Sequence, residues 1–235
     1  KESRGMIEIV DCEQGSEAWF AARLGLPTAS EFKKVLAKSK ELRMRTGYMR
    51  KLAGEIITGK PAESYTNFDM ERGHEQEPEA RELYAYITEA ELQRVGFIRN
   101  GDKGCSPDSL IGNNGAVEIK TGLPHILVEK IEADTFPSEH EAQCQGVLWV
   151  AEREWIDLVI YCPDMPLFTK RAYRDEKFIE KIASEVARFN EELAELVTKI
   201  RNYGGVKDSS SIKKQLKASL EIEDESGRTE PRHPD

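Results

Sequence analysis

The chain has 235 residues, of which 39% are hydrophobic, and it carries a formal net charge of −9. This length can bury one sizeable core, whereas no apolar stretch approaches the roughly 20 residues that cross a bilayer. The four cysteines are dispersed without a C-x-x-C pair, which argues against a zinc ribbon or iron–sulfur cluster and favours a reduced, cytoplasmic compartment. We expect no signal peptide, one domain at residues 1–205, and a flexible tail at residues 206–235.

The charge is unevenly distributed. Nine basic and two acidic residues lie between positions 33 and 60, so this segment carries +7 and the remainder −16. A basic segment can neutralise nucleic-acid phosphates, and such binding weakens as salt rises. The alternative is a helix face that is merely solvated. The basic residues are Lys33, Lys34, Lys38, Lys40, Arg43, Arg45, Arg50, Lys51 and Lys60.

The first two predicted helices flank a candidate anion site. Residues 16–24 are predicted as a short helix with its aromatic residues facing the core. A capping box at Thr28-Ala29-Ser30-Glu31 would begin the next helix, with the Thr28 hydroxyl bound to the N–H of Glu31. A helix start offers free N–H groups to an anion, and Arg23 can hold a phosphate through two N–H groups. We therefore predict a phosphate site here.

The rest of the chain alternates between helical and strand patterns. Helices are predicted over residues 48–57, 71–86 and 138–150, and strands over residues 95–98, 154–161 and 167–173. The buried stripe of the helix at 71–86 is predicted to comprise Ala80, Leu83, Tyr84 and Ile87. A long helix capped by Asp175 has apolar residues at every third or fourth position and ends near Gly204.

The segment Val117-Glu118-Ile119-Lys120 has the alternation of a half-buried strand. Asp108 lies ten residues before Glu118, and a hairpin turn at Asn113-Asn114-Gly115 would bring the two together. Two carboxylates suit Mg2+ and the hydrolysis of a phosphodiester. Lys120 would orient the attacking water rather than act as base, because neighbouring carboxylates favour its charged form. The alternative is a cross-strand salt bridge without metal.

A third carboxylate is available on the helix predicted at residues 71–86. Glu77 could complete the metal site, although it and its neighbours Glu75 and Glu79 could instead form an exposed acidic face. His74 precedes Glu77 by three residues. Imidazole is a poorer magnesium ligand than oxygen, which favours a surface histidine there.

Six motifs occur in order between about residues 13 and 204. They are Glu13-Gln14-Gly15…Trp19…Arg23-Leu24-Gly25, Thr28-Ala29-Ser30-Glu31, Gly73…Glu77…Ala80-Arg81, Cys105-Ser106-Pro107-Asp108, Glu118-Ile119-Lys120 and Ala142-Gln143-Cys144-Gln145. In this order they resemble the phage lambda exonuclease group, the YqaJ-type viral recombinases of the PD-(D/E)xK superfamily. The resemblance implies an α/β fold with a restriction-endonuclease-like central mixed sheet, flanking helices and a long C-terminal helix.

The resemblance also implies roles for single residues. The metal ligands would be Asp108, Glu118, the Ile119 carbonyl and Glu77, with Lys120 as the catalytic lysine. The residues that receive the 5′-phosphate of the digested strand would be Arg23, Ser30, Ser106 and Gln145, with Gln143 as a neighbour of the active site.

The activity implied is that of a Mg2+-dependent, two-metal deoxyribonuclease, with Mn2+ able to substitute. It would digest double-stranded DNA processively from a free 5′-phosphorylated end in the 5′-to-3′ direction, leaving 3′ overhangs for phage-type recombination by single-strand annealing. Family members form homotrimeric rings, and the expected partner is a single-strand annealing protein in the host cytoplasm. The alternatives are an endonuclease or single-strand exonuclease of the same superfamily, or a DNA-end-binding protein without catalysis.

Overall fold

The computed structural model describes residues 7–62 and 68–203. The chain divides into two compact units, residues 1–193 and residues 194–235, and the boundary falls within the last helix. The predicted boundary between domain and tail, at residue 205, lies outside the described residues.

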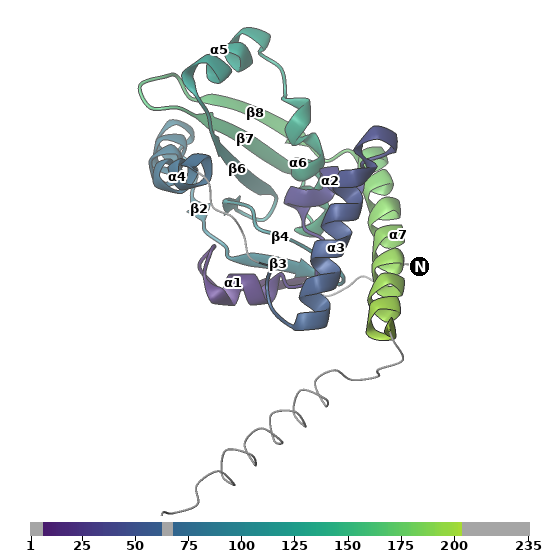
Figure 1. Ribbon diagram of the computed structural model, residues 1–235. Coiled ribbons are helices and arrows are strands. Elements are labelled where there is room, and N and C mark those ends of the chain that lie inside the picture. The colour runs from purple at the N-terminus through teal and green to yellow at the C-terminus, as the bar shows by residue number, and fades with distance from the viewer. Residues whose placement is uncertain (1–6, 63–67, 204–235) are drawn as a thin grey trace, which may run out of the picture. The chain divides into compact units, whose positions relative to one another are not determined.

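A five-stranded mixed sheet forms the centre of the first unit (Figure 1). Its third and fourth strands are parallel to each other, and the other neighbours are antiparallel. In order across the sheet the strands are β2 (Leu92–Gln93), β5 (Ser109–Ile111), β6 (Gly115–Thr121), β7 (Trp155–Tyr161) and β8 (Phe168–Tyr173). A smaller antiparallel sheet has the order β1 (Ile7–Val10), β3 (Phe97–Asn100) and β4 (Lys103–Cys105). The predicted mixed sheet is confirmed.

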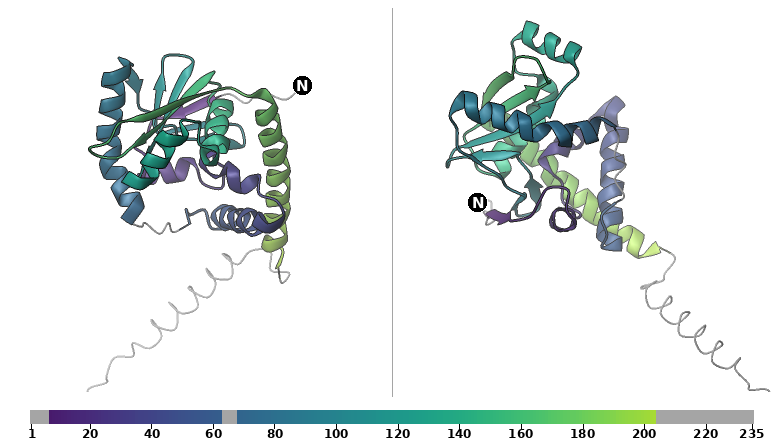
Figure 2. Two further views of the ribbon diagram at one scale, coloured as in Figure 1. Left: turned by 90° about the horizontal axis from the view of Figure 1, so that it is seen from above. Right: turned by 90° about the vertical axis from the view of Figure 1, so that its left-hand side faces the viewer.

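Helices flank the sheet, as predicted (Figures 1 and 2). They are α1 (Glu17–Ala22), α2 (Phe32–Val35), α3 (Leu42–Thr58), α4 (Phe68–Thr88), α5 (Pro124–Ala133), α6 (Glu141–Val150) and α7 (Glu176–Arg201). Parallel strands need a crossover connection, and α5 and α6 belong to the one between β6 and β7. The long C-terminal helix α7 is confirmed together with its cap, because Asp175 accepts the N–H groups of Lys177 and Phe178.

The faces of β6 are divided between α4 and α6. Val117 and Ile119 pack in one buried cluster with Ala80 and Tyr84 of α4, as the alternation predicts. Glu118 points the other way, where α6 reaches it. Since helices cover both faces, Glu118 on the charged face of this strand is buried, whereas Lys120 at its end is partly exposed.

The hairpin that leads from Asp108 to β6 is confirmed, but its turn differs from the prediction. β5 pairs antiparallel with β6, and Ser109 lies opposite Val117. The residue of the turn with positive φ is Gly112 (φ 49°). Gly115 is already the first residue of β6, so the predicted Asn-Gly turn is displaced towards the N-terminus.

Two other local predictions are wrong. The capping box at residues 28–31 does not form: Thr28 makes no capping bond, and residues Ala29–Glu31 are a single 3-10 turn (η1) before the four residues of α2. The Thr28 hydroxyl is bound to Arg23 instead. Ile87 is exposed rather than buried, because it lies in the last turn of α4.

Candidate active site

Asp108 and Glu118 lie side by side, as predicted. The Asp108 Oδ2 accepts the backbone N–H of Ile119 at 2.5 Å, and the Asp108 N–H donates to the carbonyl of Val117 at 3.1 Å. Glu118 is only 3% exposed. Its Oε1 accepts from Lys120 Nζ at 2.7 Å and from the amide of Gln143. The hairpin therefore holds both carboxylates and the lysine on one stretch of backbone.

The second oxygen of Glu118 favours a cation site. Glu118 Oε2 is buried and has no hydrogen-bond partner among the described residues. A buried carboxylate oxygen without a donor is unfavourable, and a cation in front of it would remove the cost. Burial, followed by the charges of Glu118 and Glu77, raises the pKa of Asp108 well above its ordinary value. Bound Mg2+ would reverse this effect by stabilising the charged carboxylate.

The set of protein ligands is small. The described residues contain no group of three or more His, Cys, Asp or Glu side chains arranged to hold a metal ion. Asp108, Glu118 and Ile119 nonetheless line one cavity of about 340 Å³, so the two carboxylate residues and the residue predicted to offer its carbonyl border the same space. Mg2+ keeps several waters and needs only one or two protein carboxylates. The residues present therefore fit this ion.

Lys120 keeps its proton in this setting. Burial alone would lower the pKa of Lys120, but the charges of Glu118 and Asp108 outweigh burial and raise it above its ordinary value. A lysine with a raised pKa is a poor general base at neutral pH. It can instead donate to water or to a phosphate oxygen in the cavity that it lines.

Glu77 lines the same cavity from α4, so the structure brings the third predicted carboxylate to the site. Its Oε1 is bound to Arg81, one turn further along the helix. A cation at Glu77 would therefore have to share this carboxylate with Arg81. The side chain of His74 lies outside the described residues.

Three of the four residues predicted to bind phosphate come together. Trp19 Nε1 donates to Ser106 Oγ at 2.8 Å, and the Arg23 guanidinium lies 3.9 Å from the centroid of the Trp19 ring. Arg23 Nη2 donates to Thr28 Oγ1, which lies 3.3 Å from Ser30 Oγ. We call Arg23, Ser30 and Ser106 the phosphate-binding cluster. Burial lowers the pKa of Arg23, and a bound anion would stabilise its charge.

Sequence reasoning missed the linking roles of Trp19 and Thr28. Trp19 was interpreted as a core aromatic residue, although a tryptophan with a polar indole N–H usually needs a partner when it is buried. The anion site also differs in origin from the prediction. With only a 3-10 turn and a four-residue helix behind it, the site depends on side chains rather than on a helix dipole.

Gln145 does not lie with the phosphate-binding cluster. It is buried on α6, where its Nε2 donates to the carbonyl of Tyr173 at 2.8 Å and its Oε1 accepts the N–H of Asp175 at 2.9 Å. Both ends of the amide are thus used to fix the connection between β8 and α7. The neighbouring Gln143, expected only as an active-site neighbour, is the glutamine that contacts Glu118.

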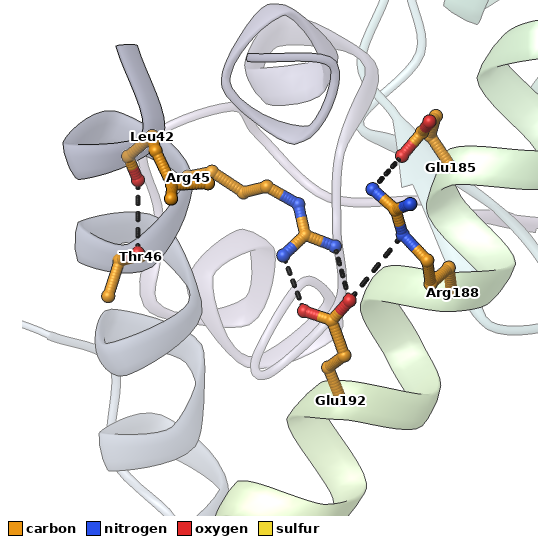
Figure 3. A network of polar contacts seen from close by, with 6 residues as sticks. All are labelled: Leu42, Arg45, Thr46, Glu185, Arg188 and Glu192. Carbon is orange, nitrogen blue, oxygen red and sulfur yellow. Dashed lines mark hydrogen bonds and ion pairs between the residues drawn. The ribbon is translucent and has the colours of Figure 1, made fainter. Parts of the chain in front are cut away.

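Part of the basic segment is internal. Arg45 is buried, and its guanidinium lies 5.2 Å from the centroid of the Phe189 ring. It forms a double hydrogen bond with Glu192, which also pairs with Arg188 (Figure 3). Two further basic residues are paired, Lys34 with Glu31 and Lys38 with Glu185. The exposed remainder comprises Lys33, Lys40, Arg43, Arg50, Lys51 and Lys60. The positive charge that a polyanion can contact on this surface is therefore smaller than the nine basic residues of the sequence suggest.

Among the described residues, no helix is long and apolar enough to cross a membrane.

Comparison with known proteins places the chain in a family. The model of the YqaJ-like viral recombinase domain matches residues 18–154, more than half of the chain. An alkaline exonuclease from Laribacter hongkongensis is 34% identical, with a TM-score of 0.73 over 80% of this chain and 97% of that one; in complex with dAMP it gives 0.74 over the same shares. A phage-related exonuclease from Haemophilus somnus 129PT, 16% identical with a TM-score of 0.59 over 74% and 96% of the chains, shares the fold. The comparison with curated proteins gives no match. The chain belongs to the YqaJ-like viral recombinase family.

Proposed function

We propose that the protein is a Mg2+-dependent exonuclease that digests one strand of double-stranded DNA from a 5′-phosphorylated end. The observation that carries this proposal is the short stretch of chain between the phosphate-binding cluster and the carboxylates. Ser106 precedes Asp108 by two residues, so their Cα atoms are at most about 7 Å apart, which is on the scale of one nucleotide. A terminal phosphate held by Arg23 and Ser106 would therefore leave the next phosphodiester at Asp108. An endonuclease needs no such seat.

The residues of the site have separable tasks in this reaction. Asp108, Glu118 and the Ile119 carbonyl would hold Mg2+ or Mn2+, and Glu77 would join them or support a second ion. The metal supplies neutralisation of the phosphodiester charge and alignment of the reacting oxygens. Lys120, held protonated, orients the attacking water or a phosphate oxygen. Gln143 and Lys120 fix Oε1 of Glu118 and leave Oε2 free for the ion.

The wider role is inferred from the family. A relative solved in complex with dAMP binds a deoxynucleoside 5′-monophosphate, which is the class of product that such digestion releases. We propose that digestion is processive in the 5′-to-3′ direction, within a homotrimeric ring around duplex DNA. The 3′ overhangs would pass to a single-strand annealing protein. The cysteines, all free in the structure, suit the reducing cytoplasm in which these steps would occur.

The test compares three DNA substrates and a matched pair of variants. Linear duplexes with 5′-phosphate or 5′-hydroxyl ends and a closed circle are incubated with Mg2+. We expect the phosphorylated end to be digested fastest and the circle to survive. Asp108→Asn should bind DNA ends without cutting, whereas the same change at the exposed Asp164 should leave the rate intact. Equal attack on all three substrates would refute the exonuclease, and normal cutting by Asp108→Asn would refute the metal site.

A further inference from the structure

A buried carboxylate lies in the central sheet, and the hydrolytic step proposed above makes no use of it. Asp157 of β7 is only 3% exposed. Its Oδ1 accepts from Arg171 Nε at 2.7 Å, and its Oδ2 accepts from Arg171 Nη2 at 2.8 Å and from the Tyr84 hydroxyl at 2.6 Å. Burying charges is costly, and a buried ion pair is weak evidence for stability. A role in fixing geometry is the alternative.

The Tyr84 hydroxyl is one of two polar anchors between α4 and β7. Burial, followed by the bond to Asp157, raises the pKa of Tyr84 above its ordinary value, so the hydroxyl keeps its proton and remains a donor. At the second anchor the strand supplies the tyrosine. Burial, followed by a hydrogen bond with Glu79 of α4, raises the pKa of Tyr161 of β7 to about 12. The two anchors occur in opposite order along the helix and the strand, so α4 runs antiparallel to β7.

The apolar contacts of α4 with the sheet place the helix less precisely than the anchors do. Ala80 and Tyr84 pack on Val117, Ile119 and Val159. Hydrophobic burial is non-directional, so a small slide or rotation of the helix would keep most of the buried area. Hydrogen bonds weaken steeply outside a narrow range of distance and angle. The two anchors therefore restrict α4 both along its axis and about it.

Glu77 lies on the anchored part of this helix, two residues before Glu79 and seven before Tyr84. Seven residues are about two turns, or about 10 Å, and return to the same face of a helix. Pro78 follows Glu77 directly, and a proline within a helix removes one backbone hydrogen bond of the preceding turn. The placement of Glu77 at the cavity that it shares with Asp108 thus depends on the anchors that follow it.

We propose that Tyr84 is a positioning residue of the metal site: its bond to Asp157, which Arg171 holds in place, sets the rotation of α4 so that Glu77 faces the cation. The inference rests on the proposed function, because it takes Glu77 as a ligand or as the support of a second ion. Tyr84 itself touches neither the ion nor the DNA. A change at Tyr84 therefore acts on the cation only where Glu77 is present.

Calorimetric titration with Mn2+ measures this coupling without relying on catalysis. The proteins are wild type, Tyr84→Phe, Glu77→Gln and the double variant. Tyr84→Phe keeps the ring in the apolar cluster and removes only the hydroxyl. We expect Tyr84→Phe to weaken Mn2+ binding by about 10-fold, the low end of the range for outer partners of metal ligands. In the Glu77→Gln background the same change should have no further effect.

A merely structural role of Tyr84 predicts a different result. Changes at independent sites combine additively to within about 2-fold, so the double variant would then bind Mn2+ about 10-fold more weakly than Glu77→Gln. That result, or an unchanged Mn2+ affinity of either single variant, would overturn the assignment. If Tyr84→Phe does not fold, Tyr161→Phe removes the second anchor and should show the same coupling to Glu77→Gln.

The matched control is Tyr86→Phe. Tyr86 lies on the same helix and is 84% exposed, so the loss of its hydroxyl should leave Mn2+ binding as in wild type. A loss equal to that of Tyr84→Phe would overturn the assignment.

The two proposals fail in different ways. Coupling between Tyr84 and Glu77 in Mn2+ binding, in a protein that digests no DNA, would support the positioning role and refute the exonuclease. Digestion of phosphorylated ends together with additive losses of Mn2+ binding would refute the positioning role and leave the exonuclease intact.

Discussion

Replacing Gln143 by leucine is expected to weaken the proposed metal site without removing one of its proposed ligands. The Gln143 amide and the Lys120 ammonium both donate to Oε1 of Glu118, and Oε2 is left without a partner. Loss of a hydrogen bond to a charged group costs about 1.5–3 kcal/mol, a factor of roughly 10 to 150. Without this donor the Glu118 carboxylate can rotate, and the affinity of the site for the cation should fall. Outer partners of metal ligands contribute about 10- to 100-fold in affinity or activity.

The assay is the digestion rate of a 5′-phosphorylated duplex as a function of Mg2+ concentration. We expect Gln143→Leu to raise the concentration at half-maximal rate by about 10- to 100-fold, and Mn2+ binding measured by calorimetry to weaken in parallel. The control is Gln93→Leu on the exposed face of β2. A purely structural role would lower the melting temperature and leave the Mg2+ dependence unchanged. That outcome, or a Mg2+ dependence equal to that of the control, would refute the positioning role.

Three further changes probe other parts of the structure. Arg23→Lys replaces a guanidinium that offers several fixed donors by a point charge, so the ratio of digestion rates on 5′-phosphate and 5′-hydroxyl ends should fall towards 1 while the Mg2+ dependence stays the same. Arg45→Met breaks the ion pair with the half-exposed Glu192. It should destabilise the protein by about 1–3 kcal/mol, less than the loss of a fully buried pair. The melting temperature should fall by roughly 2–4 °C per kcal/mol, and an unchanged melting temperature would contradict the structural role of Arg45. Burial, with the charge of Lys120 second, lowers the pKa of His140 to about 4. Below pH ~6.5 the unfolded chain binds a proton at His140 that the folded chain does not, so stability is lost as the pH falls towards 4. His140→Gln should lose less stability than wild type over this window in urea titrations, and equal losses would contradict the assignment.

The carboxylate half of the candidate site was predictable because its determinants are local. The alternation of residues 117–120 fixes which side chains share a face, and a hairpin within the preceding ten residues brings Asp108 alongside. Only the turn was misplaced, since Gly112 can adopt positive φ as readily as the later Asn-Gly pair. Short-range periodicity and turn chemistry therefore sufficed for this part of the fold.

The other half depends on side-chain contacts outside the pattern of any one helix or strand, and some of them join distant segments, as between Trp19 and Ser106. Thr28 fits a capping box by its local sequence, yet its hydroxyl contacts the side chains of Arg23 and Ser30 instead. Arg45 counts as surface charge until Glu192, far along the chain, is known to face it. α5 was not predicted because Ile126, Val128 and Ile131 are partly exposed and give no single apolar stripe. Hydrophobic periodicity in the sequence does not predict such side-chain contacts.

The β4–β5 connection joins the two halves, and its stiffness bears on the proposed reaction. Ser106 belongs to the phosphate-binding cluster and Asp108 is one of the carboxylates, with Pro107 between them. Proline fixes its own φ, the Pro107 carbonyl accepts from Gln14, and the Asp108 N–H is bound to β6. Three independent restraints thus act on two residues of chain. The distance from the strand end to the bond that is cut would accordingly be set by this short and restrained connection, so that each cycle would release one nucleotide even where the surrounding helices move.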